Sequence, residues 1–292
     1  MTEKTIEIKT YAPGMPLEGL IIGVPNDVYH AAPDSISKSG LDLVNRSPAH
    51  YFFAEDKPST RAMQLGTALH MAVLEPDLFA SSYMLLKDVT DRRTSIYKEA
   101  VKIHGSDNVL ISTEADYVAG MQESVYSNEK AKQLLKNCEY KEISVFATCP
   151  KTGVNLRCRF DGLSVKNNYA IDLKTTRDSR PDEFSKAVYN YRYHVQDAFY
   201  RYVYFLATGI ELDFFEFIAV ESDIPHPTML YRLDDISRNI GKAEYERNLN
   251  TTAECIKNNH WPAYTAESDV ISIPEWAILR YEAENNSDVI VL

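Results

Sequence analysis

Apolar and polar positions alternate most clearly in the middle of the chain, where they predict three consecutive strands. The segment NLRCRFDGLS has the period of two that sends successive side chains to opposite faces of a sheet. It places Leu156, Cys158 and Phe160 on one face, and Arg157, Arg159 and Asp161 on the other. EISVFATC before it and YAIDLKTT after it read the same way, so we expect a meander with its first turn at 150–153.

Helical patterns flank these strands. We expect one helix in SKSGLDLVN, capped by Ser37 or Ser39 and ended before Pro48, and another in MQLGTALHMAVL that ends near Pro76. Further helices are expected at about 113–135, 181–207 and 234–257, and strands at 211–222 and 228–233. This order predicts an α/β fold with a mixed central sheet flanked by helices. We expect an extended N-terminal tail over 1–25 and a single domain over 26–292, with its core at about 62–233.

The polar face of the second and third strands is unusual because two carboxylates and an ammonium share it. Asp172 and Lys174 alternate with Ile171 and Leu173 in YAIDLKTT. A Lys166-Asn167 turn puts Asp161 opposite Asp172, whereas an Asn167-Asn168 turn puts it opposite Lys174. A register shifted by one residue would bury Asp161 among apolar neighbours and is disfavoured.

Like charges on paired strands are destabilising unless something compensates them. A divalent cation is one compensator, and oxygen ligands of this kind suit Mg²⁺, with Mn²⁺ as an alternative. Such ions bind phosphate oxygens as well, so the pattern points to phosphoryl chemistry. The competing interpretation is a surface cluster of salt bridges, because D-x-K also occurs by chance.

Composition narrows the setting of this chemistry. The 292 residues suffice for a full core, and no apolar run approaches the roughly 20 residues of a membrane span. The start of the chain lacks the pattern of a signal peptide, so we expect a cytoplasmic protein without a membrane partner. A net charge of −11 disfavours a non-specific DNA coat. Basic residues nevertheless gather around the Asp172-Leu173-Lys174 triplet. They form either a local DNA channel or ordinary surface charge.

Four further residues are candidates for the same site. His70 lies one turn after Gly66, which would allow close approach of a backbone or a phosphate. Gln196 and Tyr200 are four apart and share one helix face. Glu142 opens the first strand. Each candidate has an alternative interpretation. His70 would be a structural histidine, and Glu142 an exposed strand end. Gln196 and Tyr200 would belong to an aromatic core helix that also buries Tyr191, Phe199, Tyr202 and Phe205.

Taken in order, G-x-x-x-H, E, D, D-x-K and Q-x-x-x-Y resemble the PD-(D/E)xK nuclease superfamily and its RecB-like branch. The resemblance narrows to the RecE (exodeoxyribonuclease VIII) family over about 27–281. It is carried by ISKSGLDLVNRSPAHYFF, LGTALHMAVLEPDLF, RCRFDGL, DLKTT, YNYRYHVQDAFY, WPAY and PEWA. The family pattern more often has Glu where Asp172 stands, although this branch accepts Asp.

The resemblance implies a magnesium-dependent exonuclease that digests one strand of linear double-stranded DNA from its 5′ end and leaves a 3′ overhang for recombination. It implies that Asp161, Asp172 and the Leu173 carbonyl hold metal, and that His70 completes the shell of a second ion. By the same resemblance Lys174 orients or helps to deprotonate the attacking water, while Gln196 and Tyr200 position DNA or water.

The family further implies a ring-shaped homo-oligomer, typically a tetramer, and a RecT-like single-strand annealing protein as partner. Iron–sulfur clusters occur in related nucleases, but the four scattered cysteines lack the closely spaced C-terminal group, so we expect none. Selection of a 5′ end requires a phosphate site. The candidates are Arg46, Ser47, Thr175 and Thr176, with Arg157, Arg159 and Arg177 as further DNA contacts.

Three other functions are compatible with the same residues. The first is an endonuclease that does not require a DNA end, and the second is an exonuclease that works from the 3′ end. A DNA-binding subunit without catalytic activity is the third.

Overall fold

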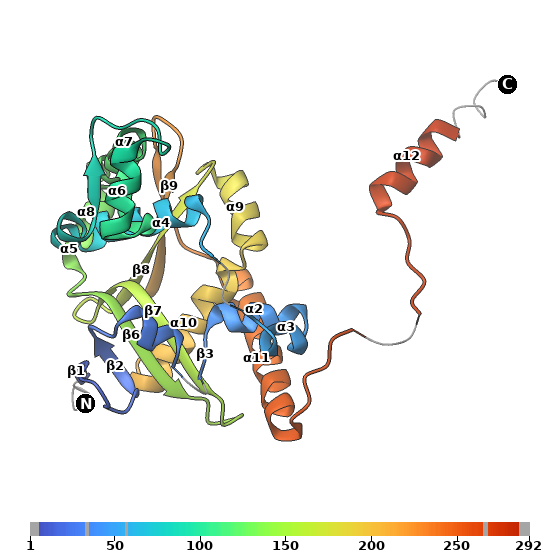
Figure 1. Cartoon of the computed structure of the whole chain (residues 1–292). Coiled ribbons are helices and arrows are strands. Elements are labelled where there is room, and N and C mark those ends of the chain that lie inside the picture. Colours follow the sequence, from blue (N-terminus) through green and yellow to red (C-terminus); the bar gives the residue numbers. More distant parts are fainter. Residues whose placement is uncertain (1–5, 33–34, 56–57, 265–267, 286–292) are drawn as a thin grey trace.

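The computed structural model describes residues 6–32, 35–55, 58–264 and 268–285. Its centre is an eight-stranded mixed sheet, which Figure 1 shows between two groups of helices. Seven strands follow the order β1-β2-β6-β7-β8-β9-β10, and β3 pairs with β7 outside that path. The strand bounds are β1 Ile8–Thr10, β2 Gly19–Ile22, β3 Ser35–Ile36, β6 Tyr140–Thr148, β7 Asn155–Ser164, β8 Tyr169–Thr176, β9 Phe214–Glu221 and β10 Thr228–Tyr231. The predicted α/β fold with a mixed sheet is confirmed.

The N-terminal segment differs from the expected tail. Both β1 and β2 belong to the main sheet, and β2 pairs antiparallel with β6 through Leu20 and Val145. Leu20 and Ile21 are almost completely buried. The apolar run GLII covers the edge of β6, so burial of these side chains explains why the segment is strand rather than loop.

One helical group packs on the sheet face that carries Leu156, Cys158 and Phe160. Its core side chains include Leu41, Phe199 and Tyr245. The helices of this group are α2 Lys38–Arg46, α9 Pro181–Asn190, α10 Tyr193–Thr208 and α11 Asp235–Asn258. Ser37 caps α2 by accepting a hydrogen bond from the Gly40 amide at 3.3 Å, which confirms one of the two predicted caps.

The second helical group covers the opposite face, where Ile171 and Leu173 of β8 lie. Leu69 and Val125 are among the buried side chains that it contributes. The helices are α4 Arg61–Leu74, α7 Ser112–Ser127 and α8 Glu129–Asn137. The strand β8 is therefore buried on both faces, which explains why only its end near Lys174 reaches solvent.

Two expected helices are each divided in the structure. The helix expected over 113–135 breaks at Asn128, whose side chain caps α8 by accepting a bond from the Ala131 amide. The helix expected over 181–207 breaks at Arg192, which has left-handed backbone angles (φ 57°, ψ 42°). Arg192 also pairs with Asp42 at 2.7 Å and Glu244 at 2.6 Å, so ion pairs to α2 and α11 stabilise the break.

The remaining elements lie at the periphery. A two-stranded parallel sheet joins β4 to β5, and α6 occupies a stretch that had no predicted element because its composition is polar. Their bounds are α1 Asn26–His30, α3 Pro48–Phe52, α5 Pro76–Ser82, β4 Met84–Leu86, α6 Ser95–His104, β5 Val109–Ile111 and α12 Glu275–Asn285. Figure 1 draws α12 apart from the sheet and its helices. Within the described residues no helix is long and apolar enough to cross a bilayer.

The hairpin between β7 and β8 decides the register. Gly162 pairs with Ile171 and Ser164 with Tyr169. Continued by one residue, this register places Asp161 opposite Asp172, as the Lys166-Asn167 turn predicted. The carboxylates therefore lie on neighbouring strands at the same level of the sheet.

Candidate active site

Asp161 lies at the point where β7 enters the site, and it is only 9% exposed. Its Oδ2 accepts a hydrogen bond from the Leu173 amide at 2.7 Å and lies 3.3 Å from Nδ1 of His70 on α4. Burial, followed by the charge of Asp172, raises the pKa of Asp161 to about 6, although His70 and Lys174 oppose the rise. The folded protein therefore holds this carboxyl where a nearby positive charge favours its ionised form.

Glu142 reaches the same point from β6. The pairing of β6 with β7 skips Glu142 and Asp161, and Glu142 has a φ of 49°, which is unfavourable for a residue with a side chain. One ligand atom each from His70, Glu142 and Asp161 lies within 4.8 Å of the other two. Burial, followed by the charge of Asp161, raises the pKa of Glu142 to about 8. The strained backbone thus brings a second carboxylate to Asp161.

Asp172 has different partners from Asp161. It is 3% exposed, Nζ of Lys174 lies 2.5 Å from its Oδ2, and the Gln196 side-chain amide donates to its Oδ1. Burial alone lowers the pKa of Lys174, but the carboxylates of Asp172 and Asp161 outweigh it and the pKa is raised. The two carboxylates therefore favour the ammonium form of Lys174. Its Nζ also lies 4.7 Å from the centroid of the Tyr193 ring, a cation–π contact.

A cleft of about 1020 Å³ opens over His70, Glu142 and Asp161, the three candidate metal ligands. His70, Glu142, Asp161 and Tyr200 all line it. Tyr200 packs edge-on against Phe160 at 5.3 Å between centroids, so the core fixes its ring. Gly66 lines the same wall, and a Cβ there would meet Thr175 Oγ1 at 3.8 Å. The helix α4 therefore runs close to the end of β8.

The predicted surroundings of Gln196 and Tyr200 are only partly correct. Phe199 is fully buried and Tyr202 is partly buried, as an aromatic core helix requires. Tyr191 and Phe205 are exposed instead, by 64% and 41%. The break at Arg192 places Tyr191 between two helices, which removes it from the buried face.

The two predicted DNA-contacting arginines of β7 line the cleft, but their donors bond within the protein. Arg159 donates to Ser144 Oγ at 2.9 Å and the Val24 carbonyl at 2.7 Å, and it lies over the Tyr29 ring. Arg157 donates to Ser35 Oγ at 2.9 Å. Both side chains therefore fasten the segment between β2 and β3 to the sheet.

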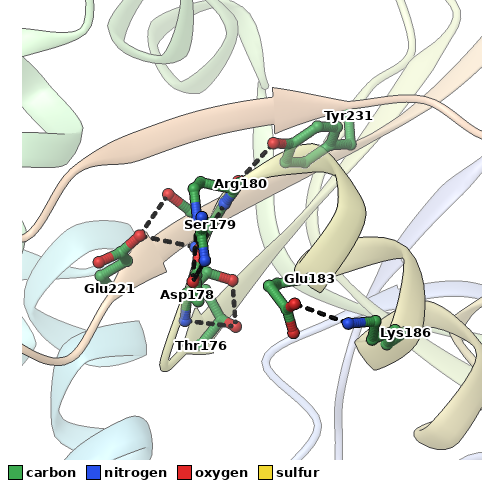
Figure 2. A network of polar contacts seen from close by, with 8 residues as sticks. All are labelled: Thr176, Asp178, Ser179, Arg180, Glu183, Lys186, Glu221 and Tyr231. Atoms are coloured by element: carbon green, nitrogen blue, oxygen red, sulfur yellow. Dashed lines mark hydrogen bonds and ion pairs between the residues drawn. The ribbon is translucent and has the colours of Figure 1, made fainter.

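The predicted phosphate contacts are also divided between internal and exposed positions. Ser47 is buried and caps α3, its hydroxyl 2.6 Å from Nδ1 of His50. Thr176 belongs to the network in Figure 2, where its hydroxyl donates to the Asp178 carbonyl at 3.0 Å. Arg46, Thr175 and Arg177 are exposed. Of the predicted phosphate contacts, these three can meet a ligand without giving up a hydrogen bond within the described part of the protein.

The network in Figure 2 also fixes the chain directly after the D-x-K strand. Glu221 of β9 accepts bonds from the Ser179 amide at 2.7 Å and the Ser179 hydroxyl at 2.9 Å. Tyr231 of β10 donates to the Ser179 carbonyl. These bonds anchor the connection to α9 on two neighbouring strands, so the end of β8 has a defined position beside the site.

Lys38 is a cleft residue that the sequence did not single out. Its Nζ donates to the Tyr191 carbonyl at 2.6 Å and pairs with Asp42 at 2.7 Å. Burial lowers its pKa, and Lys174 contributes to the lowering. Its position in ISKSGLDL, directly after the capping serine, is the only local signal that could have drawn attention to it.

The model of one protein family matches residues 37–273, which is most of the chain. Its description is "PDDEXK-like domain of unknown function (DUF3799)". The chain belongs to this family. The matched range contains His70, Glu142, Asp161, the D-x-K triplet and Gln196, so the site lies within the PDDEXK-like domain. Nucleases of the PD-(D/E)xK type use divalent metals. No curated protein sequence matches the chain.

Solved structures support the fold. A crystal structure from Eubacterium rectale, named "Putative exonuclease", aligns with a TM-score of 0.58 at 14% identity, covering 89% of this chain and 98% of that one. An alkaline exonuclease from Laribacter hongkongensis covers 80% of this chain and 97% of its own at 11% identity. Its TM-score of 0.28 is too low to support an argument. The first similarity shows a shared fold.

Proposed function

We propose that the protein is a magnesium-dependent exodeoxyribonuclease. The observation that carries the proposal is the convergence of His70, Glu142 and Asp161 beside the Asp172–Lys174 pair, in an open cleft of a PDDEXK-like domain. A binding protein has no need of buried carboxylates whose pKa values are raised by burial and by neighbouring carboxylates.

The residues present suit a hard divalent cation. Asp161 and Glu142 supply carboxylate oxygens and His70 an imidazole nitrogen, and the raised pKa values show that the carboxyls need a compensating positive charge. Asp172 and the Leu173 carbonyl complete the ligand set in the proposal, on the strength of the resemblance. When bound, the ion polarises a phosphate oxygen and lowers the pKa of coordinated water.

The protein's own groups have separate tasks in this proposal. Lys174, as an ammonium ion, positions the attacking water and balances the charge of the phosphate. Gln196 holds the Asp172 carboxylate, so it is a positioning residue. Tyr200 offers a hydroxyl to the cleft from a ring fixed by Phe160.

The direction of digestion and the partners are the finer part of the proposal. The resemblance to the RecE family supports digestion from the 5′ end of linear duplex, a 3′ overhang, a cytoplasmic location, a homotetrameric ring and a RecT-like annealing partner. The name "Putative exonuclease" of the similar Eubacterium rectale structure supports exonuclease activity in general and says nothing of direction or partners. Arg46 and Thr175 remain the proposed contacts of the 5′ phosphate, and Arg177 remains a proposed further contact of the DNA.

The proposal is tested by release of acid-soluble nucleotides from linear duplex DNA, with Mg²⁺ and with EDTA. We expect release only with Mg²⁺, and loss by about 100-fold or more in Lys174→Ala. Lys166→Ala is the matched control, because Lys166 is exposed in the turn of the same hairpin. Normal activity of purified, folded Lys174→Ala would refute the assignment.

Substrate design separates the remaining nuclease activities. DNA labelled at its 5′ or 3′ end is expected to lose the 5′ label first, and covalently closed circles are expected to stay intact. Cutting of intact circles would establish an endonuclease, and earlier loss of the 3′ label would reverse the direction. Binding of DNA with no nucleotide release under any metal condition would identify a non-catalytic subunit.

A further inference from the structure

Exposed apolar side chains stand at the mouth of the cleft. Phe52 at the end of α3 is 54% exposed, Phe53 next to it is 73% exposed, and Met63 at the start of α4 is 61% exposed. Phe52 and Met63 line the same cleft as Asp161 and His70. Apolar side chains that gather beside a polar site indicate an interaction surface, whereas isolated ones do not.

The Phe52 ring is held in place although it is exposed. It stacks on Trp261, with 5.3 Å between centroids and 23° between planes, and Phe53 packs against it edge-on at 5.0 Å. Trp261 also contacts Tyr51, and the Ala49 amide donates to the Pro262 carbonyl at 3.1 Å. The segment after α11 thus supports α3 from behind, so binding at Phe52 would cost little side-chain entropy.

The chemistry of the cleft specifies what this ring would meet. Its floor carries the proposed metal ligands, which select a phosphate, and its mouth carries a rigid aromatic surface. Its volume of about 1020 Å³ is slightly larger than the roughly 300–1,000 Å³ of small-molecule sites. A nucleotide has both features, a phosphate and a flat base, and aromatic rings stack on bases of any sequence.

We propose that Phe52, supported by Trp261 and flanked by Phe53 and Met63, stacks on an unpaired base of the DNA strand whose phosphate enters the metal site. This inference rests on the proposed nuclease function and adds to it a substrate feature, a terminal nucleotide separated from its complement. The stacking surface would hold that base while the phosphodiester bond lies over Asp161 and Glu142.

Binding without turnover gives the first test. A duplex carries 2-aminopurine as an unpaired 5′-terminal base, and its binding is measured in EDTA by anisotropy and by the fluorescence of that base. Phe52→Ala is expected to weaken binding by about 5- to 100-fold and to remove the quenching that stacking causes. Phe52→Tyr is expected to restore both. Phe205→Ala, an exposed phenylalanine outside the cleft lining, is expected to change neither.

Three results would overturn the inference. The first is unchanged affinity and quenching in Phe52→Ala, and the second is an equal loss in Phe52→Tyr, which keeps an aromatic ring. The third is a change in oligomeric state of Phe52→Ala by size-exclusion chromatography, because the surface would then be a contact between copies of the chain.

Nucleotide release by the unaltered protein keeps this inference separate from the proposed function. If the unaltered protein and the Phe52→Ala variant digest duplex DNA equally well, the stacking inference is contradicted and the proposed nuclease function is not. A protein that releases no nucleotides with Mg²⁺ contradicts the nuclease function, whatever Phe52 does.

Discussion

The two parts of the polar face of β7 differ in how the protein compensates their charged side chains. Arg157 and Arg159 occupy the outer part of the polar face of β7, and Asp161 occupies the inner part. The arginines donate to Ser35, Val24 and Ser144, whereas Asp161 accepts one backbone bond and faces His70 across 3.3 Å. The guanidinium groups donate hydrogen bonds to neighbouring residues, although Nε of Arg157 is buried without a partner, whereas the carboxylate retains a need for positive charge.

This difference teaches how to separate structural from functional polar groups on a buried strand. A satisfied cation fixes a neighbouring segment, and its removal should cost stability. A buried carboxylate next to a second one costs stability as it stands, so its removal should cost function instead. Variants of both kinds of residue test this contrast.

The largest expected effect is on activity. Asp161→Asn should lower the rate of nucleotide release by about 1,000-fold or more, because the proposed metal site loses a charged ligand. Its melting temperature in EDTA should stay equal or rise, since a buried carboxyl with a raised pKa becomes a neutral amide. Initial rates and thermal unfolding measure the two quantities. Activity within tenfold of the unaltered protein would contradict the role of Asp161.

A second prediction concerns pH and metal. Because the pKa is raised to about 6 in Asp161 and about 8 in Glu142, the metal-free folded protein keeps protons that the unfolded chain has already released. Its stability should therefore fall as the pH rises from about 4 to about 8. Mg²⁺ replaces these protons, so its stabilisation should grow with pH.

The size of this effect follows from binding linkage. At a free Mg²⁺ concentration 1,000 times Kd, stabilisation reaches about 4 kcal/mol. Thermal unfolding with Mg²⁺ and with EDTA, at low and at high pH, measures it. The double variant Asp161→Asn with Glu142→Gln is the control and should lose both the pH slope and the response to Mg²⁺. An unchanged response in that variant would place the ion elsewhere.

The third prediction tests the structural half of the comparison. Arg159→Ala should lower the free energy of unfolding by about 2–3 kcal/mol, because Ser144 is buried and loses its partner along with the Val24 carbonyl. Arg93→Ala is a matched control, since Arg93 is highly exposed and bonds only to neighbouring Asp91 in the interactions described here. Denaturant unfolding measures both. Equal, small effects would show that Arg159 is not a structural clamp.

The smallest expected effect belongs to Glu142. Glu142→Gly should raise the stability of the metal-free protein by about 1 kcal/mol, because glycine tolerates a φ of 49° and the buried carboxyl is removed. The same variant should bind metal more weakly, as isothermal titration calorimetry would show. Lower stability would mean that the side chain supports the fold rather than the site.

Most of the helices and strands that were predicted correctly follow from local sequence patterns. Alternation and turn residues were enough for the three central strands, but they left two registers open, and the structure has the one that puts Asp161 opposite Asp172. The breaks at Asn128 and Arg192 were not predicted, although asparagine, a favoured N-cap residue, is a local signal at the first of them. At Arg192 the deciding contacts, to Asp42 and Glu244, come from other helices.

The candidate site divides in the same way. The strand period anticipates that Asp172 and Lys174 share one face, whereas the contact of Gln196 with Asp172 was expected only from the resemblance. The bonds of Arg157 to Ser35 and of Arg159 to Val24 could not be predicted, because these partners lie more than 100 residues away along the chain. The aromatic contact of Phe52 with Trp261 is equally remote in sequence.

The backbone at Glu142 has an evolutionary consequence. A lineage that retained DNA cutting has a reason to keep an acidic residue in a conformation that favours glycine. A lineage that no longer cuts DNA gains stability from each drift toward glycine or asparagine there. The residue at this one position in a relative would therefore serve as a marker of whether that relative is still under selection for catalysis.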